Sequence, residues 1–206
     1  SFFLAIESST QSITDDYWSK KLPKVVDITV AAAETLRDTS ERLGIPIRVQ
    51  AGFVIGHAGI TEERETIEQI YDSMCFGRYL VDRGLLEYTV FSLYQPFPGT
   101  ISYDNLKKWG MIVSEHAMTF GVYSIAGEDE YSPRSLEALR LAGWLFANRS
   151  EMTDGRSDLN LEPNREVDPH AHIDKHYREL HLANLEQRYE AWVSEHMSDM
   201  SVSIAD

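Results

Sequence analysis

Three short polar clusters each follow an apolar run, and they are the parts of the chain best placed for chemistry. They are Glu7-Ser8-Ser9, Ile55-Gly56-His57 and Tyr94-Gln95-Pro96. Apolar runs that alternate with helical segments indicate a parallel sheet, and such sheets bind ligands at the carboxyl ends of their strands. We therefore expect the three clusters to meet at one edge of a sheet, beside a ligand.

The stretch 51–63 contains three glycines within eight residues. Glycine has no Cβ, so it suits backbone that turns tightly or passes close to a ligand. A helix is predicted to open at Thr61 as its N-cap, with Glu62 and Glu63 favoured by the positive end of the helix dipole. A plain strand-to-helix turn would use the same glycines, so the stretch alone leaves both interpretations open.

The elements that would position these clusters alternate between strand and helix. Hydrophobic periodicity predicts strands over 2–6, 47–55 and 87–94, a polar loop after the first strand, and helices over 24–42 and 62–74. The first helix has apolar residues spaced on one face and Gly44 placed to end it. Those residues are Val25, Ile28, Ala32, Leu36 and Leu43. This order is typical of an α/β protein with a parallel sheet.

The organisation changes after Thr100. A short helix is predicted over 103–109, and Ser132-Pro133 opens another that reaches about Asn148. Residues 150–167 form a polar linker or long loop, after which Asp168-Pro169 opens a helix to about Met197. That last helix carries an apolar seam suited to docking on another surface. The seam consists of Leu182, Leu185, Tyr189, Trp192 and His196.

The composition excludes several classes of protein. The net charge of −14 argues against binding to nucleic acid or to an anionic membrane. The single cysteine, Cys75, excludes a disulfide scaffold and favours a reducing, cytoplasmic location. No apolar run is long enough to span a bilayer.

Three segments in order resemble the second half of a radical SAM domain. Residues 4–11, Leu-Ala-Ile-Glu-Ser-Ser-Thr-Gln, are similar to the family's fourth-strand segment, and the 52–63 stretch is similar to its fifth-strand glycine region. Residues 91–100, Phe-Ser-Leu-Tyr-Gln-Pro-Phe-Pro-Gly-Thr, resemble its sixth strand and the following turn. Ser9 and Ala58 stand where the family usually has glycine and proline.

The resemblance covers roughly residues 1–149 and implies an α/β fold, namely parallel strand-helix repeats forming half of a partial TIM-type (β/α)6 barrel with a mainly helical C-terminal extension. Residues 1–110 would be the second half of the barrel, 111–149 a helical continuation packing on it, and 150–206 a loop with a long amphipathic helix. The family's Cys-x3-Cys-x2-Cys motif has no counterpart in this chain. We therefore expect a fragment whose cluster-bearing N-terminal half is a missing portion of the same protein or a complementary chain.

The activity implied is that of a radical SAM enzyme, which binds S-adenosylmethionine and uses a 5′-deoxyadenosyl radical to abstract hydrogen from a small-molecule or peptide substrate. The branch that uses cobalamin would give methylation or cyclisation, with the cobalamin domain and the [4Fe-4S] ligands outside this chain. The residues that the resemblance assigns to cofactor binding are Glu7, Ser8, Gln11, Arg48, Gly52, Ile55, Gly56, Tyr94 and Gln95.

Other interpretations stay open. The chain could be a non-catalytic α/β domain that binds a protein partner through its C-terminal helix. The histidine-rich stretch contains His172 and His176 one helical turn apart, a spacing that can chelate zinc. This stretch also includes His170 and His181, and a solvated helix surface is its default interpretation. An ordinary TIM-barrel-derived hydrolase lacks a paired acid-base signature here.

Overall fold

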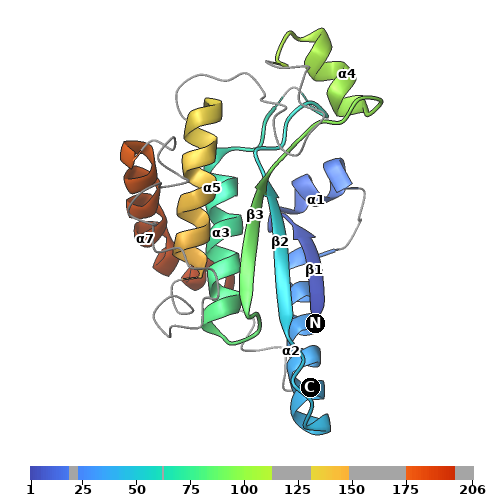
Figure 1. The fold of residues 1–206 in the computed structure, drawn as a ribbon, viewed down its shortest axis with the longest axis vertical. Helices are drawn as coiled ribbons and strands as arrows, with labels where there is room; N and C mark the ends of the chain where they lie inside the picture. Colours follow the sequence, from blue (N-terminus) through green and yellow to red (C-terminus); the bar gives the residue numbers. More distant parts are fainter. Residues whose placement is uncertain (19–22, 62, 113–130, 149–174, 198–206) are drawn as a thin grey trace, which may run out of the picture.

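The structure, a computed structural model, describes residues 1–18, 23–61, 63–112, 131–148 and 175–197 (Figure 1). Its elements are β1 (Phe2–Glu7), α1 (Gln11–Trp18), α2 (Val25–Leu43), β2 (Val49–Ile55), α3 (Ile67–Asp82), β3 (Tyr88–Leu93), α4 (Ile101–Lys108), α5 (Pro133–Ala147) and α7 (Lys175–Met197). The polar linker predicted over 150–167 lies outside the described residues.

The described strands form one three-stranded sheet in the order β1-β2-β3, and both neighbouring pairs are parallel. The predicted α/β class with a parallel sheet is therefore confirmed. Because the strands run in the same direction, the three polar clusters that follow them lie at one edge of the sheet, as expected. The pairing of β1 with β2 shifts register between Ala5 and Glu7, and Glu7 adopts a left-handed φ of 73°.

One face of this sheet carries the core. Phe53 of β2 and Phe91 of β3 stack on that face with ring centroids 5.3 Å apart. Helix α3 approaches closely there because Gly77 has no side chain, and a Cβ at that position would lie 3.2 Å from the Phe91 ring. Helices α2, α3 and α5 contribute buried residues to the same core, and α7 packs on α3 and α5 (Figure 1).

The described residues leave the opposite face of the sheet largely bare. Phe3 is 61% exposed on it, and Ala5 and Ser92 are exposed as well. Among the described helices, α1 and α4 approach this face only at the carboxyl edge (Figure 1). Parallel sheets in folded proteins are ordinarily covered on both faces, so this half-covered arrangement is unusual.

Helix α2 forms where the periodicity predicts and ends at Gly44, which takes a left-handed φ of 63°. The predicted buried face was wrong in part. Val25 is buried, but Ile28 is 40% and Leu43 57% exposed, and Val30 and Ala33 are buried in their place. Apolar residues occur on several sides of this helix, so spacing alone did not determine which side packs on the sheet.

The N-terminus of α3 is a second correction. The helix begins at Ile67, with Thr66 as its N-cap and Gln69 completing a capping box, and not at Thr61. The Thr61 hydroxyl instead donates to the carbonyl of Glu63. The polar segment after β1, predicted as a loop, contains helix α1, whose Thr14 hydroxyl donates to the carbonyls of Thr10 and Gln11.

The C-terminal helices complete the core. Ser132 caps α5 and Thr100 caps α4, close to the predicted starts. Leu185 and Trp192 of the predicted seam on α7 are buried, so this chain already covers part of that seam. The start predicted at Asp168-Pro169 lies outside the described residues.

A buried histidine joins three of these helices. His181 of α7 lies with its Nδ1 2.9 Å from the Tyr71 hydroxyl of α3 and its Nε2 3.2 Å from the Ser135 hydroxyl of α5. Asn184 donates to the same Tyr71 hydroxyl. Burial lowers the pKa of His181 below the ordinary value of 6.5. The imidazole is therefore neutral in the folded chain around pH 7.

This burial predicts a loss of stability in acid. Below about pH 6.5 the unfolded chain takes up a proton at His181 before the folded chain does, so the free energy of unfolding falls until the folded-state pKa is passed. Urea denaturation between pH 7.5 and 5.5 should show a shallower acid slope for His181→Gln than for the wild type. His176→Gln, at an exposed position of the same helix, is the matched control. Equal slopes for His181→Gln and the wild type would contradict the prediction.

Candidate functional site

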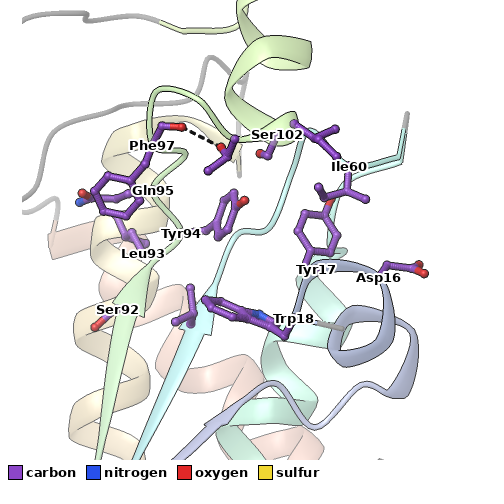
Figure 2. Close-up of a pocket in the computed structure, with 13 residues that line it drawn as sticks. Asp16, Tyr17, Trp18, Ile60, Ser92, Leu93, Tyr94, Gln95, Phe97 and Ser102 are labelled. Carbon is purple, nitrogen blue, oxygen red and sulfur yellow. Dashed lines mark hydrogen bonds between the residues drawn. The ribbon is translucent and has the colours of Figure 1, made fainter. Parts of the chain in front are cut away.

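A cavity of about 590 Å³ opens at the carboxyl edge of the sheet (Figure 2). Four parts of the chain form it, namely the end of α1, the end of β2 with the segment that follows it, the end of β3 with the segment that follows it, and the start of α4. Its lining residues are Asp16, Tyr17, Trp18, Val54, Ile60, Ser92, Leu93, Tyr94, Gln95, Phe97, Thr100, Ile101 and Ser102. The cavity therefore lies where the sequence predicts a ligand.

Aromatic rings dominate the walls of this cavity. Tyr17 and Tyr94 meet edge to face with their centroids 5.7 Å apart, and Trp18 lies below them in the view of Figure 2. Phe97 adds a fourth ring from the segment between β3 and α4. The Thr100 hydroxyl donates to the Phe97 carbonyl over 2.7 Å, which closes that segment into a turn. Flat apolar rings from several directions suit a planar ligand.

Behind the rings lies a buried histidine. His57 is fully buried, and its ring centroid is 4.9 Å from that of Tyr94 and 5.0 Å from that of Tyr17. Its Nδ1 is 2.9 Å from Glu65 Oε2, and its Nε2 is 2.9 Å from the Trp18 indole Nε1. The same Glu65 oxygen accepts the backbone N–H groups of Gly56 and His57 over 2.7 and 3.1 Å. This carboxylate therefore fixes the turn that follows β2.

A hydroxyl cluster holds the end of β1. The buried Ser73 hydroxyl of α3 lies 3.3 Å from that of Ser8 and 3.2 Å from that of Ser9, and it accepts the backbone N–H of Ser9. The Ser8 hydroxyl also accepts the backbone N–H of Thr10. These bonds join the segment after β1 to α3, and α1 follows directly from it.

Helix α4 closes the cavity from the other side. The Ser102 hydroxyl donates to the carbonyl of Ala58 over 2.7 Å, and the Asn105 side-chain amide donates to the carbonyl of Gly59 over 2.8 Å. Gly59 has a left-handed φ of 94°, and a Cβ there would lie 2.6 Å from the Ser102 hydroxyl oxygen. The close approach of α4 therefore requires glycine at this position.

The structure brings several of the predicted site residues to one edge. Tyr94 and Gln95 line the cavity itself. Glu7, Ser8 and Gly56 lie at the same edge, at or just after the ends of β1 and β2, but they do not line this cavity.

The other predicted residues lie elsewhere. Arg48 precedes β2 at the opposite edge of the sheet, where it pairs with Glu87 at 3.5 Å. Gln11 begins α1 and accepts the backbone N–H of Val25, so it joins α1 to α2. The Ile55 side chain is fully buried in the core. The space over Gly52 is occupied by the Phe3 ring, 2.6 Å from where a Cβ would be.

In the part of the chain that the structure describes, no group of three or more His, Cys, Asp or Glu side chains could hold a metal ion. Burial raises the pKa of the Cys75 thiol to about 12, so it is protonated near neutral pH and is a poor ligand. His181 is used in the helix contacts described above, and His176 is exposed. His170 and His172 lie outside the described residues.

Sequence reasoning missed the residues that shape this cavity most. Trp18 lay in a segment predicted as a loop, and His57 was only part of a strand-end cluster. Glu65 lay in the segment predicted as a helix over 62–74 and was not singled out there. The sequence does contain one signal, because His57 and Glu65 lie on either side of a turn with glycine. That signal does not point to Trp18, whose indole donates to His57.

The comparisons with known proteins do not assign a function. The chain matches no family model, no curated protein and no solved structure. Among the described helices, none has the length and apolar character required to cross a bilayer. The functional argument therefore depends on the geometry of the cavity and the sheet.

The contact between Gly59 and α4 gives a testable prediction. Gly59→Ala should lower the free energy of unfolding by about 1–3 kcal/mol more than Gly99→Ala, because overpacking adds a cost of that order. Both glycines have a left-handed φ, but a Cβ at Gly99 would meet nothing within 4 Å. The difference measured by urea denaturation therefore isolates the α4 contact. Equal costs for the two substitutions would show that α4 is not held this way.

Proposed function

We propose that this chain supplies the carboxyl half of a radical SAM domain and that its cavity holds the nucleoside part of S-adenosylmethionine. The observation that carries the proposal is the aromatic-walled cavity at the carboxyl edge of the parallel sheet. It lies between the second and third of the segments whose sequence resembles that family. Ligands of open parallel sheets bind at this edge.

The cavity suits an adenosine in size and in chemistry. Its volume of about 590 Å³ is within the ordinary range for small-molecule sites. The rings of Tyr94 and Trp18 offer faces for a purine, and stacking of a base on an aromatic side chain tolerates any base. The side chains of Gln95, Thr100 and Ser102 provide the amide and hydroxyl groups that would hydrogen-bond the base edge or the ribose.

The charge of the cavity distinguishes between kinds of nucleoside. None of the described residues that line it is Lys or Arg, and Asp16 contributes a carboxylate. A phosphorylated nucleotide would find no cationic partner there, whereas the sulfonium of S-adenosylmethionine is positive. Aromatic faces attract such cations. The lining therefore favours a nucleoside that is neutral or cationic.

The bare face of the sheet supports the second part of the proposal, that another portion completes the domain. Phe2 and Phe3 of the edge strand β1 are 52% and 61% exposed. A parallel strand with an open edge and exposed aromatic residues is suited to pairing with a further strand. In the proposed domain that strand belongs to the N-terminal half of the protein or to a complementary chain, and the bare face lines the inside of the partial barrel.

The described residues do not fit an iron-sulfur cluster. Cys75 is buried and protonated, and a single thiolate cannot hold a cluster that needs several. In the proposal the cluster ligands, and any cobalamin domain, belong to the other portion. When bound there, the cluster would supply the electron that cleaves S-adenosylmethionine to the 5′-deoxyadenosyl radical.

The alternative function, a non-catalytic domain that binds a partner through its C-terminal helix, has weaker support. The residues that would dock on a partner include Leu185 and Trp192, which are buried against other helices of this chain. The aromatic cavity would also have no role in that interpretation. We therefore favour the radical SAM assignment.

The cavity is tested by substituting Tyr94 in the completed protein. Tyr94→Ala should weaken binding of S-adenosylmethionine about 5- to 150-fold, because the loss of one base-stacking side chain costs about 1–3 kcal/mol. Tyr94→Phe keeps the ring and should bind nearly as the wild type does. Isothermal titration calorimetry measures the affinity, and Tyr103→Ala in α4, outside the lining, is the control. An unchanged affinity for Tyr94→Ala would remove this cavity from the binding site.

The requirement for a second portion is tested by activity. These 206 residues alone, given S-adenosylmethionine and dithionite under anaerobic conditions, should produce no 5′-deoxyadenosine. The product should appear once the portion with the cysteine cluster is supplied, as measured by liquid chromatography and mass spectrometry. Production by the chain alone would contradict the fragment assignment.

A further inference from the structure

The hydrogen bonds of His57 determine which of its nitrogens carries the proton. An indole N–H can donate but not accept, so the contact between Trp18 Nε1 and His57 Nε2 requires a lone pair on Nε2. The proton of a neutral imidazole is then on Nδ1, from which it donates to Glu65 Oε2. One tautomer therefore satisfies both neighbours, and a second proton on Nε2 would place two donors against each other.

Glu65 is held so that it can select this tautomer. Its Oε2 accepts two backbone N–H groups of the turn after β2 as well as His57 Nδ1. The side chain is buried, and its Oε1 has no hydrogen-bond partner in the described structure. A buried carboxylate is costly unless such bonds compensate it. The His57 Nδ1–H is therefore one of three donors that compensate this buried carboxylate.

Trp18 is the member of this group that reaches the cavity. It is the last residue of α1 and is partly exposed, and its ring lines the cavity (Figure 2). Its indole N–H donates to the buried imidazole of His57. The ring meets that of His57 edge to face with centroids 5.9 Å apart. The hydrogen bond to His57 therefore sets the orientation of one aromatic wall.

We propose that His57 is a positioning residue of the cavity: Glu65 fixes the tautomer of His57, and that tautomer holds the indole of Trp18 as a wall for the ligand. We call this chain of hydrogen bonds from Glu65 through His57 to Trp18 the relay. It applies to any planar ligand of the cavity, and it rests on the proposed function only for the identity of that ligand. It assigns a role to a histidine, a glutamate and a tryptophan that the family resemblance does not assign.

The first test needs neither a ligand nor a variant of His57. In the ¹⁵N-labelled chain of 206 residues at pH 7.5, His57 should show a protonated-type shift at Nδ1 and an unprotonated-type shift at Nε2. The indole N–H signal of Trp18, assigned by its loss in Trp18→Phe, should exchange slowly with solvent. The opposite tautomer, or fast exchange of that indole proton, overturns the proposal.

Substitutions then separate positioning from simple packing. His57→Asn keeps a donor toward Glu65 but cannot reach Trp18, so the indole proton of Trp18 should exchange quickly with solvent. The longer side chain of His57→Gln reaches further and should slow this exchange again in part. Glu65→Gln removes the charge that selects the tautomer, so the His57 nitrogen shifts should move toward a mixture. Unchanged indole exchange in a folded His57→Asn overturns the relay. If His57→Asn does not fold, the wild-type signals decide.

Adenosine is the probe for the effect on the cavity. His57→Asn and Trp18→Phe should each weaken adenosine binding about 2- to 10-fold, the size of one hydrogen bond, as measured by titration calorimetry. Trp109→Phe, at the 40%-exposed tryptophan that ends α4, is the matched control. Wild-type affinity in His57→Asn overturns the proposal. Absence of adenosine binding in the wild type counts against the proposed function, and the nitrogen and indole signals still decide the relay.

Discussion

The structure depends most on the carboxylate of Glu65 at the turn after β2. A single oxygen accepts the backbone N–H groups of Gly56 and His57 together with the imidazole Nδ1 of His57. Those bonds turn the chain away from the sheet and direct His57 toward α1 (Gln11–Trp18). The same turn presents the carbonyls of Ala58 and Gly59 to α4. Both helices that close the cavity are therefore positioned from this turn.

The chemistry of the cavity follows from the side chains that the turn after β2, α1 and α4 expose to it. The buried polar groups satisfy one another behind the aromatic rings, so the ligand meets mainly ring faces and a few neutral polar groups. The one described carboxylate in the lining and the net charge of −14 both disfavour anionic ligands. A planar, uncharged or cationic molecule fits these walls better than a phosphorylated one.

The bare face of the sheet and the cavity support the same proposal. The main described core cluster lies on the face covered by α2, α3 and α5, where the stacked Phe53 and Phe91 are buried. The other face ends in the cavity, so a portion that covered the sheet would also come close to any ligand bound there. This arrangement would let the second portion contribute to the site without altering the core described here.

The parts of the fold predicted from sequence are those set by local signals. Strand ends were predictable because apolar runs stop at polar or proline-containing clusters, and Ser132-Pro133 marked the start of α5. The start of α3 was not predicted correctly, because Thr61 and Thr66 are both good N-caps. Only Gln69, which completes a capping box with Thr66, distinguishes them.

The site residues that were missed depend on contacts between distant segments. The role of His57 requires Trp18, which lies 39 residues earlier in the chain. The side-chain direction of Ile55 and the position of the Phe3 ring over Gly52 are likewise set by tertiary packing. Strand alternation groups Ile55 with Phe53 on one face of β2, but it does not indicate which face the helices cover or where the Phe3 ring lies.

Photolabelling tests the central claim, that the ends of β2 and β3 and the end of α1 form one nucleoside site. We would irradiate the completed protein with an 8-azidoadenosine analogue of S-adenosylmethionine and locate the adducts by peptide mass spectrometry. The account predicts adducts within residues 16–18, 54–60 and 92–102, suppressed by excess S-adenosylmethionine. Adducts confined to other described segments, or adducts in these segments that S-adenosylmethionine does not suppress, would contradict it.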